Sequence, residues 1–165
     1  AGAQGTSGMS RRHILLVALK RTGAFKKQHN RRMGLTLGEH LVNTYDDLLR
    51  MGAEEDVALG GGLHSIYGTN SFRNASVPPD QRPVIRKLFG ERAERLAWLF
   101  STINRPQGLE SGDIRDWRSG EPVEVSADDL QDLRLIEVAN LRDNGAKLSN
   151  YPNLERFNEE RQALT

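Results

Sequence analysis

Three consecutive glycines, residues 60–62, lie inside an apolar stretch that runs from residue 57 to residue 72. Each glycine lowers helix propensity by roughly 1 kcal/mol relative to alanine, so three in succession indicate a requirement for space. Close approach of a neighbouring backbone or of a ligand would explain that requirement. On a helix, Val57 and His64 share one side with the first two of these glycines. We therefore predict that this helix forms the floor of a pocket.

The overall composition argues against several classes of binding partner and of functional site. A chain of 165 residues suits one domain with a substantial core. Its 23 Lys and Arg nearly balance its 22 Asp and Glu, which argues against a partner that is a nucleic acid or an anionic membrane. There is no cysteine, which excludes disulfides, thiol catalysis and thiolate metal sites. With no apolar run near the roughly 20 residues of a membrane span and no signal-peptide pattern, we expect a cytoplasmic protein whose oligomeric state stays open.

Apolar periodicity and capping signals predict an all-α fold. Thr36 and Glu39 have the spacing of a capping box, and Ser126 with Asp129 marks the start of another helix. The expected helices cover residues 10–22, 36–52, 80–89, 91–103, 126–142 and 152–162, with the glycine-rich stretch as one more. We predict a compact single-domain bundle of about six to seven helices.

Two details of the domain organisation complete this prediction. Residues 1–8 precede Met9 and look like a cloning remnant, so the helical domain is assigned to residues 9–165. Ser119-Gly120 would suit the turn of a short β-hairpin between residues 107 and 125.

Three of the four histidines are expected to meet. His40 and His64 occupy the inward sides of consecutive helices, and a turn at Gly52-Ala53 makes these helices antiparallel neighbours. His29 lies in the basic loop, residues 24–34, that leads into the His40 helix. Buried imidazoles on facing helices can share a metal ion or act as an acid–base pair. Alternatively, each simply makes a hydrogen bond inside a packed core.

A histidine on one helix, followed by a histidine that closes an Ala/Leu/Gly-rich helix, resembles the HD-domain superfamily. Residues 58–65, Ala-Leu-Gly-Gly-Gly-Leu-His-Ser, are similar to its second motif, and residues 138–142, Val-Ala-Asn-Leu-Arg, to its last. The motif Leu-His-Ser-Ile-Tyr-Gly-Thr, residues 63–69, is also similar to a divergent, uncharacterised HD-like family. The resemblance covers residues 28–143. It implies an HD-like helical bundle and metal-assisted hydrolysis, for example of a phosphate ester.

Two departures bear on the metal that this resemblance implies. Ser65 stands where the superfamily has the aspartate that follows its second histidine, and Asn140 stands where it has the last aspartate. Serine and asparagine are neutral and are weaker ligands for divalent ions than carboxylates are. A site of His29, His40 and His64 would still leave a coordination position open for a metal-bound water, with Fe, Mn or Zn as the ion. Without metal, the same histidines would act as general acid and base.

Further side chains are expected to contact the ligand. Tyr67 and Thr69 follow the pocket helix and are candidate hydrogen-bond donors, with Tyr67 grouped with the catalytic histidines. Asn140 would orient the ligand or hold a histidine tautomer. Ser65 and Arg105 complete the substrate-binding set, because an arginine would recognise an anionic substrate.

These observations lead to a small-molecule enzyme with a histidine-lined pocket. It is either a metal-assisted hydrolase of the phosphohydrolase type or a metal-independent lyase, isomerase or cyclase. The alternative is a non-catalytic module that binds a ligand or a protein and retains a degenerate HD site. The sequence does not decide between these hypotheses.

Overall fold

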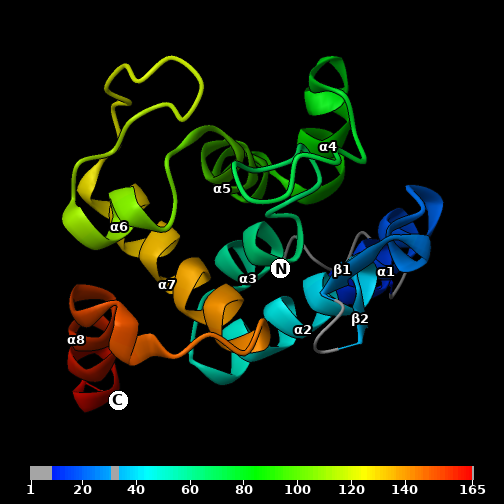
Figure 1. Cartoon of the computed structure of the whole chain (residues 1–165). Helices are drawn as coiled ribbons and strands as arrows, with labels where there is room; N and C mark the ends of the chain where they lie inside the picture. The colour runs from blue at the N-terminus through cyan, green and yellow to red at the C-terminus, as the bar shows by residue number, and fades with distance from the viewer. Residues whose placement is uncertain (1–8, 31–33, 165) are drawn as a thin grey trace.

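The computed structural model describes residues 9–30 and 34–164, so the predicted cloning remnant at 1–8 lies outside the described residues. The described part folds into a helical bundle with one small sheet (Figure 1). Its α-helices are α1 (Arg11–Arg21), α2 (Leu37–Arg50), α3 (Glu55–Gly62), α4 (Arg82–Phe89), α5 (Glu91–Thr102), α6 (Gln107–Ser111), α7 (Ala127–Asp143) and α8 (Pro152–Ala163). The predicted all-α bundle is confirmed, with eight α-helices in the described residues instead of six to seven. The additional helix is the five-residue α6.

The helix starts follow the predicted capping residues. Thr36 and Glu39 form a reciprocal capping box at α2, and Ser126 and Asp129 form another at α7. Each box satisfies backbone N–H groups that have no partner within the helix. Gly52, with a φ of 85°, provides the left-handed residue after α2 that lets the chain turn back into α3.

The glycine triplet places α3 in the middle of the bundle, with α2, α5 and α7 around it (Figure 1). A Cβ at Gly60 would lie 2.9 Å from the Cβ of Leu96 on α5. One at Gly61 would overlap the side chain of Leu48 on α2, and one at Gly62 would lie 2.7 Å from a methyl group of Leu15 on α1. The predicted need for space is therefore real, but the prediction of a pocket floor is wrong for the glycines. Neighbouring helices fill the space.

The β-strands lie in a different part of the chain from the predicted hairpin. The two-stranded antiparallel sheet consists of β1 (Gln28–Asn30), inside the expected loop at residues 24–34, and β2 (Leu35–Thr36), directly after it. Because β2 runs directly into α2, its pairing with β1 holds His29 beside the start of that helix. Between residues 107 and 125, the expected hairpin is reduced to one isolated antiparallel bridge, Arg115 to Pro122.

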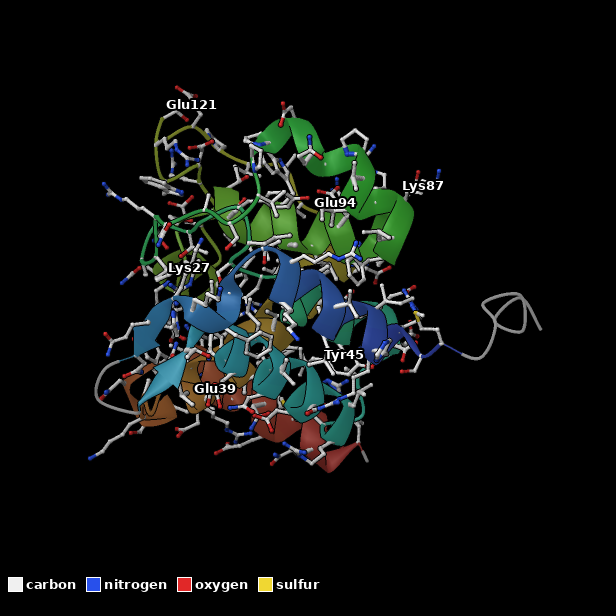
Figure 2. All side chains as sticks on the ribbon, turned by 90° about the vertical axis from the view of Figure 1, so that its right-hand side faces the viewer. Lys27, Glu39, Tyr45, Lys87, Glu94 and Glu121 are labelled. Atoms are coloured by element: carbon white, nitrogen blue, oxygen red, sulfur yellow. The ribbon has the colours of Figure 1, made fainter. Side chains whose placement is uncertain are left out.

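Buried charges are paired within the helical layers. Figure 2 shows Glu94 in the layer of α4 and α5 and Tyr45 in the layer of α1 and α2. Glu94 is 1% exposed and accepts hydrogen bonds from Arg82 at 2.8 and 3.0 Å, which offsets the cost of burying its charge. None of the described helices has the length and apolar character needed to cross a bilayer.

We expect Gly60→Ala to lower the free energy of unfolding by about 1–3 kcal/mol, as overpacked core positions do. The clash involves the Cβ of Leu96, which cannot move away by side-chain rotation, so the higher helix propensity of alanine does not compensate. Urea denaturation measures the change. A variant as stable as the parent would show that α3 and α5 do not approach each other this closely.

Candidate functional site

A cavity of about 280 Å³ lies at the end of α3, between β1, the turn at residues 69–72, and α7. Its lining includes His29, His64, Ser65, Thr69, Arg105 and Asn140, six of the eight residues proposed from the sequence. Phe72 and Phe100 supply its apolar part. The cavity is therefore small, mixed in polarity, and close to the predicted place.

The three histidines converge, as their positions in the sequence predict. The rings of His29 and His40 are stacked, with centroids 4.3 Å apart and an interplanar angle of 18°. His64 meets His40 edge-on, with centroids 5.1 Å apart. His40 itself is fully buried, so it stands behind the two rings that line the cavity.

Both ring nitrogens of His40 are held by α7. Nδ1 lies 2.6 Å from Oδ2 of Asp143, and Nε2 lies 2.7 Å from Oδ1 of Asn140. The amide of Asn140 is oriented by Glu137, whose carboxylate accepts a hydrogen bond from Nδ2 at 2.9 Å, so the oxygen of Asn140 must face His40. Because both nitrogens of His40 then face acceptors, each carries a proton. The imidazolium is balanced by the carboxylate of Asp143.

Arg105, which also lines the cavity, extends this network. Its Nε and Nη2 donate to the two carboxylate oxygens of Glu137 at 2.7 and 3.2 Å, and Nη1 donates to Ser71 at 2.7 Å. Glu137 is fully buried, so it requires this counter-charge. Arg105 lines the cavity as expected, but its guanidinium already pairs with Glu137, so binding of an anionic substrate by Arg105 stays a prediction.

His64 keeps one nitrogen for the cavity. Nδ1 lies 2.6 Å from the backbone oxygen of Gly61. Since a carbonyl only accepts, this nitrogen carries the proton and Nε2 carries the lone pair. Burial, followed by the positive charge of His40, lowers the pKa of His64 well below its ordinary value. His64 is therefore a neutral imidazole with an acceptor nitrogen.

His29 and Ser65 each present a buried polar atom without a partner. His29 Nε2 donates to Asn144 Oδ1 at 3.2 Å, while its Nδ1 has no hydrogen bond within the described residues. Burial, followed by the charge of His40, lowers the pKa of His29 to about 4. The Oγ of Ser65, on a residue 1% exposed, is likewise unpaired within the described part of the chain. Both residues line the same cavity.

Tyr67 does not belong to this site. Its hydroxyl donates to Glu94 at 2.9 Å, and its ring packs edge-on against Trp98 with centroids 5.4 Å apart. Burial, followed by the hydrogen bond to Glu94, raises the pKa of Tyr67 above its ordinary value. Tyr67 therefore joins the turn after α3 to α5, and it is not among the residues that line the cavity, where it was expected. Thr69 does line the cavity, but its hydroxyl accepts from the backbone N–H of Phe72 at 2.9 Å.

The donor set does not fit the divalent metal that the HD resemblance implies. His40 has both nitrogens occupied by protein acceptors, so it cannot bind an ion in this arrangement. The possible metal ligands that remain are His29, His64 and the neutral hydroxyl of Ser65. Across residues 9–30 and 34–164, no group of three or more His, Asp or Glu is arranged to hold a metal ion.

Three residues of the network were missed in the sequence. Glu137, Asp143 and Asn144 lie three before, three after and four after Asn140 on α7. Helical spacing puts residues three or four apart on neighbouring positions of one face. Once Asn140 was singled out, this spacing could have identified all three.

Comparison with known proteins gives one match. The family model described as "Domain of unknown function (DUF6817)" matches residues 18–105. The chain belongs to this family. Comparisons with curated proteins and with solved structures give no match. The segment matched by the DUF6817 model contains His29, His40 and His64, whereas the α7 residues that hold His40 lie beyond it.

We expect the stability of the fold to fall as the pH falls from 6.5 towards about 4, in part because of His29. A histidine whose pKa is lowered in the folded state takes up its proton more readily when unfolded, so acid favours unfolding. His29→Gln should make the dependence shallower in urea denaturation across this range. His13→Gln, at an exposed position, is the control. Equal slopes for both variants would contradict the assignment.

Ser65→Ala should leave the free energy of unfolding within about 0.5 kcal/mol of the parent or raise it, because no hydrogen bond is lost and an unpaired buried group is removed. The matched control is Thr44→Val. The hydroxyl of Thr44 is equally buried but donates to the backbone oxygen of His40 at 2.8 Å, so its removal should cost about 1 kcal/mol. Thermal or urea denaturation compares the two. A loss for Ser65→Ala as large as for Thr44→Val would show that its hydroxyl has a protein partner.

Proposed function

We propose that this DUF6817 protein is a small-molecule enzyme that uses metal-independent acid–base chemistry at the His29/His64 cavity. The observation that carries the proposal is a pair of buried atoms on one cavity, His29 Nδ1 and Ser65 Oγ, that have no hydrogen-bond partner among the described residues. An unpaired buried polar group costs about 1–3 kcal/mol, and a bound molecule that supplies a hydrogen bond removes this cost. Two imidazole acceptors favour a ligand with O–H or N–H donors, such as a polyol, a hydroxy acid or an amide.

His64 is the proposed general base. The hydrogen bond from Nδ1 to Gly61 fixes its tautomer, so Nε2 is the nitrogen that would take a proton from the ligand. The imidazolium of His40, whose ring centroid is 5.1 Å from that of His64, would stabilise negative charge that develops on the ligand. This arrangement suits proton abstraction in a lyase, isomerase or cyclase reaction.

The scaffold is proposed to be HD-like. In support, His40 comes from α2, His64 from the turn directly after α3, and Asn140 from a later helix that meets His40, the order that the resemblance implies. The metal-assisted hydrolase receives less support, because both nitrogens of His40 are already hydrogen-bonded to the protein. On this proposal, Asn140 and Asp143 hold His40 as a fixed positive charge.

One observation favours the second candidate, a non-catalytic binding module. His40, Asn140, Glu137 and Arg105 satisfy one another in a closed network, as purely structural polar clusters do. In that case only His29, together with the residues at the end of α3, would contact the ligand, and no bond of the ligand would change.

A thermal-shift screen of polar metabolites, followed by NMR detection of products, tests the enzyme. On any substrate found, His64→Gln should lower kcat about 100-fold or more, the usual contribution of a general base. His13→Gln should retain the parent rate, and a chelator should leave it unchanged. Unchanged turnover in His64→Gln, or activity that needs added Fe, Mn or Zn, would contradict the proposal. Ligand binding without turnover would favour the binding module.

A further inference from the structure

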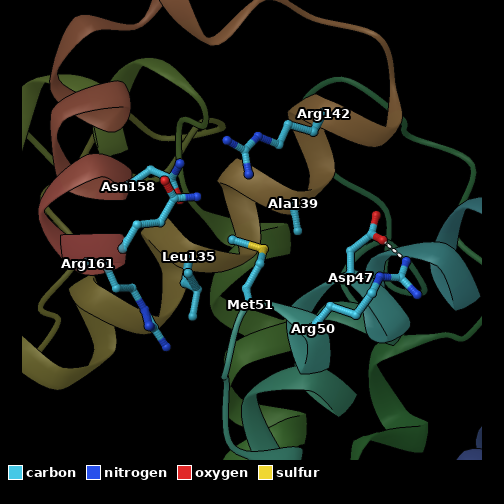
Figure 3. A pocket seen from close by; sticks show the side chains of 9 residues that line it. Asp47, Arg50, Met51, Leu135, Ala139, Arg142, Asn158 and Arg161 are labelled. Atoms are coloured by element: carbon cyan, nitrogen blue, oxygen red, sulfur yellow. Dashed lines mark hydrogen bonds and ion pairs between the residues drawn. The ribbon is translucent and has the colours of Figure 1, made fainter. Parts of the chain in front are cut away.

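A second, larger cavity of about 480 Å³ lies between α2, α7 and α8, away from the histidines (Figure 3). It uses the opposite side of α7. Asn140 and Asn144 line the histidine cavity, whereas Leu135, Ala139 and Arg142 line this one. Leu135, Ala139 and Met51 from the end of α2 give it an apolar floor. The two cavities therefore share one helix, α7, but no lining residue.

The polar side of this cavity is positively charged. Its lining contains one carboxylate, that of Asp47, and three arginines, Arg50, Arg142 and Arg161. Arg50 pairs with Asp47 one turn away on α2, as the dashed line in Figure 3 shows. Arg142 from α7 and Arg161 from α8 form no ion pair with any residue in the described ranges. The cavity thus has, beside its apolar floor, a solvent-exposed guanidinium group from Arg142 and a partly buried one from Arg161, neither with a carboxylate partner among the described residues.

A buried amide adds an independent observation. Asn158 on α8 is 4% exposed and lines this cavity, yet its side chain has no hydrogen bond to another described residue. Figure 3 shows the guanidinium of Arg142 directed across the cavity towards Asn158. The amide of this largely buried asparagine thus opens onto the cavity beside two arginines that have no carboxylate partner among the described residues, which indicates a place for a molecule with acceptor oxygens.

We propose that this cavity is a second binding site, for a small organic anion with a phosphate or carboxylate head group and an apolar body. The head group would accept hydrogen bonds from Arg142, Arg161 and the amide of Asn158, because guanidinium groups pair well with both kinds of oxyanion. The body would pack on Met51, Leu135 and Ala139. The site does not depend on the chemistry proposed for the histidine cavity.

Isothermal titration calorimetry with four probes tests the ligand chemistry. Phenyl phosphate should bind most tightly, benzoate and inorganic phosphate more weakly, and phenol not measurably, because the site needs both charge and an apolar body. Arg142→Gln and Arg161→Gln should each raise the Kd of phenyl phosphate about tenfold or more. Arg21→Gln makes the same change of charge at an exposed position on α1 and should retain the parent Kd, as should His64→Gln.

Asn158→Asp provides a second measurement that does not depend on ligand affinity alone. The isosteric carboxylate would face two uncompensated arginines, so it should raise the Tm of the ligand-free protein and abolish phenyl phosphate binding. A buried asparagine with a purely structural role would lose stability on gaining a charge. A lowered Tm, equal affinities for Arg142→Gln and Arg21→Gln, or phenol binding as tight as phenyl phosphate would each overturn the proposal.

Discussion

The two hydrogen bonds that α7 makes to His40 determine how the rest of the site is organised. They join α2 to α7 through a fully buried ring, and they place a proton on each nitrogen. The resulting positive charge contributes to the low pKa values of His29 and His64. His40 therefore acts through its neighbours, and the two rings beside it are kept neutral and able to accept hydrogen bonds.

One of these two bonds requires a fixed orientation of the Asn140 amide, and that orientation depends on the ion pair between Arg105 and Glu137. Arg105 neutralises the buried carboxylate of Glu137, and that carboxylate turns the amide of Asn140 so that its oxygen meets His40. Asparagine suits this position because it donates to one group and accepts from another. An aspartate there would offer only acceptors and would face a second carboxylate. An asparagine at position 140 is thus consistent with a role in a hydrogen-bond network.

Local signals in the sequence predicted most of the helices and the meeting of the histidines. The capping box at Thr36 and the turn at Gly52 are short-range features, and they suffice to set α2 against α3. The partners across the chain could not be predicted in the same way. Tyr67 is directed to Glu94 because α5 packs tightly on α3, and periodicity does not indicate which helix fills the space beside a glycine. The strands at residues 28–36 are too short to show alternation.

Nitrogen-15 NMR of the histidine rings in the folded protein at neutral pH tests the central claim most directly, because it reports the proton on each ring nitrogen. The account predicts that His40 carries protons on both nitrogens, that His64 carries one on Nδ1 only, and that His29 carries one on Nε2 only. A neutral His40 with a single proton, or a proton on Nε2 of His64, would contradict it. With a proton on Nε2 of His64, the cavity would lack the acceptor nitrogen on which the proposed chemistry rests.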